Sequence, residues 1–255
     1  GSPVLLAYRE DPVLDRLMMG WSLGVPDFSY QWDSQVHEFW RIEKPAEVDL
    51  IIGLVARVEQ VYIADGHHRM AVAASYDPMR TVSALLVGVS ELQMRSYHRQ
   101  VELPTDYRRD KLLWTIEKHW YHSAIPDNRR YVPDRKARIG MCLEGRWFQL
   151  DLKPESGVHP LLADAQLLQE TILYPGIGLR EPTTAKGLHY FVEGELAQHT
   201  GMGKVAFTLF PMTAEELLRQ AETGCNLPPK STRISPRIPY GLLLNDLHTH
   251  KDVGG

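Results

Sequence analysis

The chain has 255 residues, of which 44% are hydrophobic and 24% are charged, and its formal net charge at pH 7 is −4. This length is sufficient for one large domain or two small domains with a buried core. The acidic balance disfavours non-specific binding to nucleic acid, which depends on a basic surface. No apolar run approaches the roughly 18 residues that a membrane-spanning helix needs. We therefore expect a globular protein whose partner is a small molecule.

The cysteines and the first two residues bear on the cellular context. Cys142 and Cys225 are too few for a disulfide framework and lack metal-ligand spacing, which fits a reducing compartment. Gly1 and Ser2 are typical of the residues that a protease leaves behind, and no signal peptide follows them. We therefore expect a cytoplasmic protein whose natural chain begins elsewhere.

Predicted strands and helices alternate through the first 89 residues. Apolar runs and alternation of apolar with polar residues indicate the strands, whereas proline starts and alanine-rich stretches indicate the helices. The expected strands are 3–8, 36–42, 61–64 and 81–89. The expected helices are 13–19, about 45–58 and 69–76.

The second half of the chain combines hairpins with helices. One helix is expected within 104–125, and strands at 137–142 and 146–152 flank Glu144-Gly145, which is typical of a hairpin turn. A helix at 159–173, a strand at 205–210 and a helix at 213–222 follow. This mixture of hairpins and strand–helix units favours an α+β fold over a regular doubly wound sheet.

The most informative stretch is the predicted strand-to-helix turn formed by Asp65, Gly66, His67, His68 and Arg69. Exposed backbone N–H groups and the helix dipole at such a turn favour an anion such as phosphate. Asp65 can bind Mg²⁺ or accept a hydroxyl proton, although it can also simply cap the helix that follows. Gly66 either lets a ligand approach the backbone or only permits a positive φ.

The histidines and the arginine of this turn each have two interpretations. Adjacent histidines cannot chelate one metal from one helix face, so we expect one of His67 and His68 to face a ligand and the other to pack or hydrogen-bond inward. Arg69 offers a bidentate fork for phosphate or carboxylate, and its alternative is a solvated salt bridge.

Two further polar clusters follow later in the chain. The segment 228–237 carries three cations and three hydroxyls, and its candidates for phosphate binding are Lys230, Ser231 and Thr232. It lacks the glycines of a Walker loop, so a solvated basic loop is an equally good interpretation. His98 and Arg99 are a weaker candidate pair, for which a structural role is the stronger interpretation.

Together these motifs resemble the family known as domain of unknown function 1015. The resemblance covers roughly residues 3–247 and rests on the segments 37–42, 65–69, 98–99, 229–232 and 241–242. Members of that family typically carry a long segment before the equivalent of Pro3, so we expect either a short natural variant or a truncated chain. Arg233 stands where the family more often has an aromatic residue.

The resemblance implies a fold and a division of the chain. The turn at 65–69 is similar to that of the ParB and sulfiredoxin-like fold, in which free-serine kinases bind nucleotide phosphates at a helix start. We accordingly expect an α+β fold with a mixed sheet flanked by helices. The core would occupy 3–103, a second α/β portion 104–247, and a tail 248–255.

The resemblance also implies roles for individual residues. Asp65, His67 and His68 would be catalytic, with Asp65 as base or Mg²⁺ contact. The residues expected to contact a phosphate or nucleotide are Gly66, Arg69, His98, Arg99, Lys230, Ser231 and Thr232.

The leading functional prediction is a phosphotransferase that uses ATP or ADP with Mg²⁺. It would move a phosphoryl group to or from a hydroxyl-bearing metabolite such as serine, chemistry that depends on positioning and charge neutralisation. The alternative is a non-catalytic sensor of a nucleotide or phosphorylated metabolite. A DNA-binding relative of ParB is disfavoured by the acidic balance.

Overall fold

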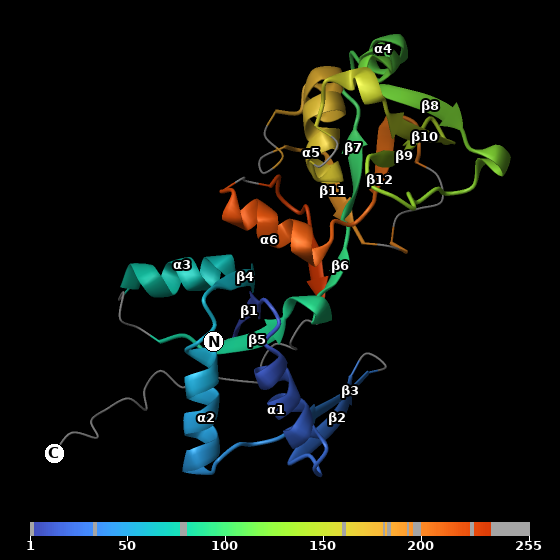
Figure 1. Ribbon diagram of the computed structural model, residues 1–255. Coiled ribbons are helices and arrows are strands. Elements are labelled where there is room, and N and C mark those ends of the chain that lie inside the picture. Colours follow the sequence, from blue (N-terminus) through green and yellow to red (C-terminus); the bar gives the residue numbers. More distant parts are fainter. Residues whose placement is uncertain are drawn as a thin grey trace. The chain divides into compact units, whose positions relative to one another are not determined.

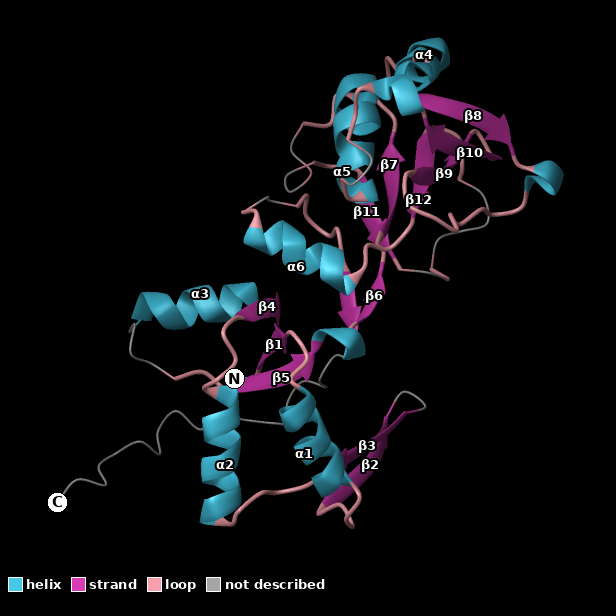
Figure 2. Ribbon diagram, in the orientation of Figure 1, coloured by secondary structure: helices cyan, strands magenta, loops and turns pink. Residues whose placement is uncertain are grey.

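The computed structural model describes residues 3–32, 35–76, 81–159, 162–180, 182, 185–192, 194–195, 200–224 and 227–235. The chain divides into two compact units. Unit 1 comprises Gly1–Leu92 with Pro236–Gly255, and unit 2 comprises Gln93–Ser235. Both units combine helices with strands (Figure 1, Figure 2), which confirms the expected α+β class. The expected boundary at 103/104 falls within unit 2, and the expected tail at 248–255 lies outside the described residues.

Unit 1 contains a three-stranded sheet in the order β4–β1–β5. β1 (Val4–Tyr8) pairs antiparallel with β4 (Val61–Asp65) and parallel with β5 (Ala84–Gly88), so this sheet is mixed. All three strands are apolar runs, and each was predicted to within a few residues. The pairing places Asp65, the last residue of β4, opposite Leu5 near the start of β1.

The helices of unit 1 begin at signals that are visible in the sequence. α1 (Pro12–Ser22) starts after Asp11, whose carboxylate accepts hydrogen bonds from the backbone N–H groups of Val13 and Leu14 at 2.8 and 3.2 Å. α2 (Pro45–Val55) also has proline at its first position, and α3 (His67–Tyr76) follows β4 directly.

A separate antiparallel pair, β2 (Phe28–Trp32) and β3 (Gln35–Phe39), completes the described strands of unit 1. β3 was predicted within 36–42, whereas β2 was not, although its aromatic residues Phe28, Tyr30 and Trp32 alternate with polar ones as in a half-exposed strand.

Unit 2 contains a six-stranded antiparallel sheet in the order β11–β7–β12–β9–β10–β8. Its strands are β7 (His98–Glu102), β8 (Trp120–Ala124), β9 (Arg138–Leu143), β10 (Arg146–Leu152), β11 (Leu188–Phe191) and β12 (Lys204–Leu209). The predicted hairpin is confirmed, because β9 and β10 are joined by Glu144 and Gly145, both with positive φ. A short ladder joins β6 (Gln93–Arg95) to β13 (Arg233–Ser235).

The helices of unit 2 are α4 (Arg109–His119), α5 (Asp164–Leu168), the π-helix η4 (Gln169–Ile177) and α6 (Ala214–Glu222). The single helix expected within 104–125 was partly wrong, because its last part is the strand β8, whose Trp120 is fully buried. Aromatic side chains fit a pleated, half-buried surface, and pairing with β10 outweighs the helical periodicity before it. The described helices include none that is long and apolar enough to cross a membrane.

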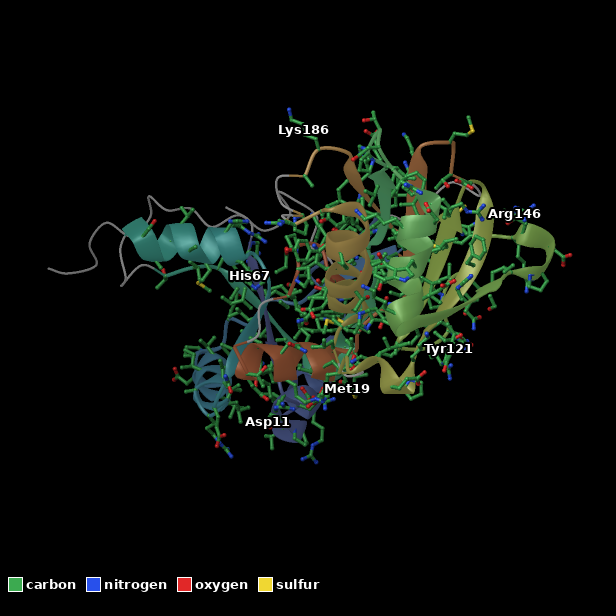
Figure 3. All side chains as sticks on the ribbon, turned by 90° about the horizontal axis from the view of Figure 1, so that it is seen from above. Asp11, Met19, His67, Tyr121, Arg146 and Lys186 are labelled. Atoms are coloured by element: carbon green, nitrogen blue, oxygen red, sulfur yellow. The ribbon has the colours of Figure 1, made fainter. Side chains whose placement is uncertain are left out.

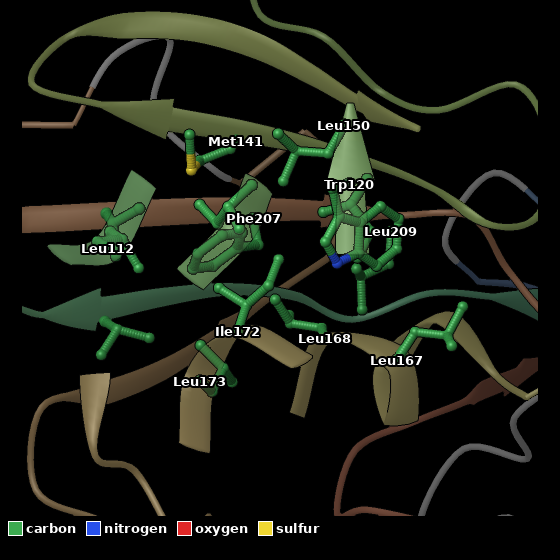
Figure 4. Close-up of a cluster of buried hydrophobic side chains, with 14 of the residues drawn as sticks. Leu112, Trp120, Met141, Leu150, Leu167, Leu168, Ile172, Leu173, Phe207 and Leu209 are labelled. Carbon is green, nitrogen blue, oxygen red and sulfur yellow. The ribbon is translucent and has the colours of Figure 1, made fainter. Parts of the chain in front are cut away.

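The main core of unit 2 lies between its sheet and its helical segments, as Figure 4 shows. Phe207 and Met141 from the sheet meet Leu168 and Ile172 from α5 and η4, and all four are fully buried. Trp120 closes this core and donates its indole N–H to the hydroxyl of Thr171 at 2.9 Å. Burial of this many large side chains makes the sheet of unit 2 a rigid base for the polar residues at its margins.

One buried carboxylate in unit 2 gives a prediction about pH. Asp164 is 4% exposed and accepts hydrogen bonds from the N–H groups of Ala137 and Phe210 at 2.9 and 3.4 Å. Burial raises the pKa of Asp164 to about 7 from an ordinary value of 3.8. Between about pH 4 and pH 7, the carboxyl of Asp164 therefore keeps its proton in the folded protein but has lost it in the unfolded chain. As a result, the free energy of unfolding falls as pH rises through this window.

We expect Asp164→Asn to remove this fall. A tenfold change in proton affinity corresponds to about 1.4 kcal/mol, so the loss in the native protein amounts to at most about 4 kcal/mol. Urea unfolding of both proteins at several pH values between 4 and 8 measures the difference. Parallel pH profiles for the two proteins would contradict the assignment.

Candidate functional site

The turn between β4 and α3 has the strand–turn–helix form that the sequence predicts. β4 ends at Asp65, Gly66 has a φ of +95°, and α3 starts at His67. The N–H of Met70 donates to the carbonyl of Gly66 at 2.9 Å, which closes the first turn of the helix. The turn therefore presents the start of a ten-residue helix at the end of an edge strand of the sheet.

His67 and His68 both lie exposed on the first turn of α3, where Figure 3 labels His67. Neither has a hydrogen-bond partner among the described residues, through its ring or through its backbone N–H. The expectation that one of them packs or bonds inward was therefore wrong. Both imidazoles lie in solvent.

Asp65 and Arg69 form an ion pair across this turn, with Oδ2 and Nη2 3.1 Å apart. The other end of the guanidinium donates to the carbonyl of Pro3 at 2.6 Å and so ties the start of β1 to α3. The carboxylate of Asp65 stays about half exposed and accepts from no backbone N–H of α3 among the described residues. Asp65 therefore does not cap the helix, whereas Arg69 does form a salt bridge.

Gly66 is required by its conformation and by its neighbours. A Cβ added here would lie 2.9 Å from Arg69 Nη2 and 3.0 Å from Val4 Cγ1, in a backbone region that residues with side chains rarely adopt. We expect Gly66→Ala to lower the free energy of unfolding by about 1 to 3 kcal/mol and to displace the Arg69 guanidinium. Chemical denaturation checks the first effect. Gly145→Ala, also at positive φ but in open space, is the control for the cost of φ alone.

A metal at this turn would have to be shared with a ligand. The described residues include no group of three or more His, Cys, Asp or Glu side chains that could hold a metal ion. Mg²⁺ in phosphoryl-transfer sites is commonly held by one or two carboxylates together with substrate phosphates. Asp65 supplies one such carboxylate, so its donor set fits Mg²⁺ only in company with phosphate.

In unit 2, the predicted residues of β7 and of the late Lys-Ser-Thr segment lie together. Arg99 Nη2 donates to the carbonyl of Pro229 at 3.4 Å, and the guanidinium lies 5.4 Å from the centre of the Tyr190 ring. Lys230 is exposed, and its Nζ lies 5.2 Å from the centre of the Tyr97 ring. The chain thus gathers two cations that are 131 residues apart in sequence, by the difference of their numbers.

Arg99 is a buried cation with no carboxylate partner among the described residues. It is 2% exposed, and its hydrogen-bond acceptors are the carbonyls of Tyr97 and Pro229, both at 3.4 Å. Burial lowers the pKa of its guanidinium to about 10. A buried charge is costly unless it is paired, so Arg99 stays a candidate for anion binding.

His98 does not share this environment with Arg99. The two are successive residues of β7, so their side chains leave opposite faces of the sheet. Nδ1 of His98 accepts the N–H of Leu209 at 3.3 Å, which leaves Nε2 to carry the proton of the neutral ring.

The rest of the late segment contributes less to the cluster. The hydroxyl of Ser231 donates to the carbonyl of Pro228 and so closes the turn that presents Lys230. Thr232 is half-buried. Pro236, Arg237 and the pair at 241–242 lie outside the described residues.

The candidate residues therefore belong to two groups. Asp65, Gly66, His67, His68 and Arg69 belong to unit 1. The candidates in unit 2 are His98, Arg99, Lys230, Ser231 and Thr232. Sequence reasoning missed Tyr190, whose ring covers Arg99, because a cross-strand neighbour leaves no local signal.

A family model described as a protein of unknown function, DUF1015, matches residues 1–172. The chain belongs to this family. The family expected from the motifs is thus confirmed, and the matched part contains both the turn at 65–69 and the pair at 98–99. The segment 229–232 lies beyond the matched residues.

Comparison with solved structures finds distant likenesses. The chain is similar to a C-terminally truncated SbnI from Staphylococcus aureus, with 10% identity, a TM-score of 0.47, and coverage of 92% of this chain and 81% of that one. It is also similar to a free serine kinase variant in complex with AMP, with 10% identity, a TM-score of 0.42, and coverage of 91% and 84%. A conserved hypothetical protein from Pyrococcus furiosus has 12% identity, a TM-score of 0.42, and coverage of 92% and 89%. No curated protein matches the chain.

Proposed function

We propose that this protein is a small-molecule phosphotransferase that binds a nucleotide or a phosphorylated metabolite at the turn formed by residues 65–69. The observation that carries the proposal is the start of α3. There the backbone N–H groups of His67 and His68, which have no partner among the described residues, lie beside one half-exposed carboxylate and two exposed imidazoles. Phosphoryl transfer needs an anion-binding surface and a nearby acid–base group more than it needs a covalent nucleophile.

Each group at the turn has a part in the proposed reaction. The N–H groups of His67 and His68 bind phosphate oxygens with the favourable dipole of α3, and either imidazole can donate a further hydrogen bond. The oxygen of the metabolite hydroxyl attacks phosphorus, and the bond from phosphorus to the leaving nucleotide oxygen breaks. Asp65 accepts the hydroxyl proton.

Arg69 has to serve both the fold and the ligand. Its Nη1 stays on the Pro3 carbonyl, while Nη2, now 3.1 Å from Asp65, is the donor that a bound phosphate would share. In the alternative role, Asp65 would hold Mg²⁺ brought in with ATP or ADP instead of accepting the proton, and the charge of the ion would offset that of the phosphates.

In unit 2, we propose that Arg99 and Lys230 bind anionic groups. Arg99 supplies a desolvated fork, and Lys230 supplies an exposed, mobile point charge. Ser231 and Thr232 are proposed as hydroxyl contacts of the same segment.

A turnover assay tests the proposal. The protein is incubated with Mg²⁺, ATP or ADP, and L-serine or related hydroxyl-bearing amino acids, and ³¹P NMR follows the appearance of a phosphate monoester. The proposal expects a new monoester signal that matches loss of the nucleotide. Hydrolysis to inorganic phosphate at the uncatalysed rate, with no ester formed from any acceptor, would reject it.

The ion pair between Asp65 and Arg69 favours a second candidate, a non-catalytic sensor of nucleotides or phosphorylated metabolites. In the present state the carboxylate is held by a guanidinium and is not a free base. Calorimetry with ATP, ADP and CTP distinguishes the two functions, because tight binding without phosphate ester formation is expected of a sensor alone.

A further inference from the structure

The three-stranded sheet of unit 1 has an open edge at β5. In the order β4–β1–β5, this strand pairs with β1 on one side and with no described strand on the other. Every second residue of a strand turns its N–H and C=O groups away from a given neighbour. Among the described residues, none forms a backbone hydrogen bond with these outward groups of 84–88. Such an edge is a template for one more strand.

The sequence of β5 does not protect this edge. Proteins usually blunt an edge strand with a charged side chain, a proline or a bulge, because an apolar edge pairs with other segments. β5 reads Ala-Leu-Leu-Val-Gly and keeps a regular register with β1. The opposite edge strand, β4, carries the carboxylate of Asp65, and its register with β1 is irregular. The edge of β5 is therefore the one that needs a cover.

The chain that leaves β13 starts close to this edge in connectivity. β13 runs antiparallel to β6, and its last residue, Ser235, lies opposite Gln93, the first residue of β6. The chain leaving Ser235 thus begins where the chain from β5 enters β6. Four residues, 89–92, separate β5 from β6, and four residues extend up to about 13 Å.

The residues that follow have the composition of a strand. After the four residues 236–239, which include two prolines, residues 240–244 read Tyr-Gly-Leu-Leu-Leu, and Asn245-Asp246 comes next. A short uncharged apolar run bounded by turn residues is typical of a buried strand. Because 236–239 and 89–92 have the same length, continuing the β6–β13 register sets 240–244 opposite 84–88.

We propose that residues 240–244 complete the sheet of unit 1 as a strand paired antiparallel with β5. The occupant of the edge is this segment of the same chain, because its tether at Ser235 gives it a high effective concentration that a second copy lacks. The division of the chain, which places Pro236–Gly255 in unit 1, agrees with this pairing. The proposal concerns the sheet alone and includes no step of the proposed phosphoryl transfer.

Amide hydrogen exchange of the full chain, followed by NMR, tests whether the edge is covered. In the native protein, we expect the outward amides of 84–88 to exchange at least about a hundredfold more slowly than in an unfolded chain. Leu243→Pro removes a ladder donor from the added strand and should return these amides to nearly the unfolded rate. The amides bonded to β1 should stay protected in this variant and so verify its fold. Thr249→Pro, beyond the apolar run, is the matched control and should exchange as the native protein does.

A pair of cysteines tests the register and identifies the occupant. On mild oxidation, Leu85→Cys with Leu243→Cys should form a disulfide within one chain, because residues directly opposite each other have Cβ atoms about 4.5 to 5.5 Å apart. Leu85→Cys with Leu242→Cys should form none, since successive residues of a strand point to opposite faces. Mass spectrometry of the digested protein identifies the bonded pair.

Four results would each overturn the proposal. The outward amides of the native protein could exchange at the unfolded rate, or they could stay protected in Leu243→Pro. The disulfide could join two chains, which would assign the edge to a second copy. The control pair could form its disulfide as readily as the opposed pair, which would reject the register.

Discussion

Replacing Asp65 by alanine is expected to abolish phosphoryl transfer while leaving the fold intact. Asp65 is the carboxylate at the turn, and a positioned general base typically contributes about 10² to 10⁴ in rate. Its side chain is about half exposed and forms an ion pair with the Arg69 guanidinium, so the fold loses little when it is removed. The measurement is the rate of ester formation by ³¹P NMR, with circular dichroism to verify the fold.

The chain offers a matched control for this variant. Asp134 and Arg138 form the same type of i,i+4 ion pair at 2.8 Å, with Asp134 mostly exposed. Asp134→Ala should therefore retain full turnover. Asp65→Asn keeps the shape of the side chain but cannot accept the proton, and it should be as inactive as Asp65→Ala. Undiminished turnover by Asp65→Ala would remove Asp65 from the mechanism.

Replacing Arg99 by methionine is expected to stabilise the protein and to weaken anion binding in unit 2. The guanidinium is buried without a carboxylate partner among the described residues, and its pKa is lowered to about 10 from 12.5. A folded-state pKa below the unfolded value means that the charged form is penalised by folding at every pH below about 10, neutral pH included.

The expected gain in the free energy of unfolding at pH 7 is on the order of 1 to 3 kcal/mol. Methionine has a similar length and no charge to bury, whereas the loss of the bonds to the Tyr97 and Pro229 carbonyls offsets part of the gain. Urea unfolding measures the change, and calorimetry with phosphate measures the loss of binding. Arg129→Met tests an exposed arginine in the same unit and should leave both quantities nearly unchanged. A destabilised Arg99→Met protein would show that the cation is structural.

The local part of the site could be predicted from the sequence, because its signals are local. The apolar run of β4, Gly66 with its positive φ and the alanine-rich α3 lie within sixteen consecutive residues, 61–76. The exposure of both His67 and His68 could not be predicted, since which side of a helix start faces the core depends on the tertiary fold.

Contacts between residues that are far apart in the sequence could not be predicted from it. Tyr190 covers Arg99 only because β11 pairs with β7, and Ser235 lies opposite Gln93 only in the β6–β13 register. The helix expected within 104–125 stops at His119 for the same reason, since Trp120 is drawn into the sheet by pairing with Leu152 of β10. Each of these features depends on pairing between strands that are far apart in the sequence, and such pairing leaves no local signal.

The central claim is that the first turn of α3 binds phosphate, and an NMR titration of the ¹⁵N-labelled protein with ADP and Mg²⁺ tests it most directly. The account predicts that the backbone amide signals of Gly66, His67 and His68 shift together and saturate with one dissociation constant. The amide of Gly145, at the β9–β10 turn of unit 2, should stay in place. Binding of ADP that leaves the amides of residues 66–68 unmoved, or no binding at all, would contradict the account.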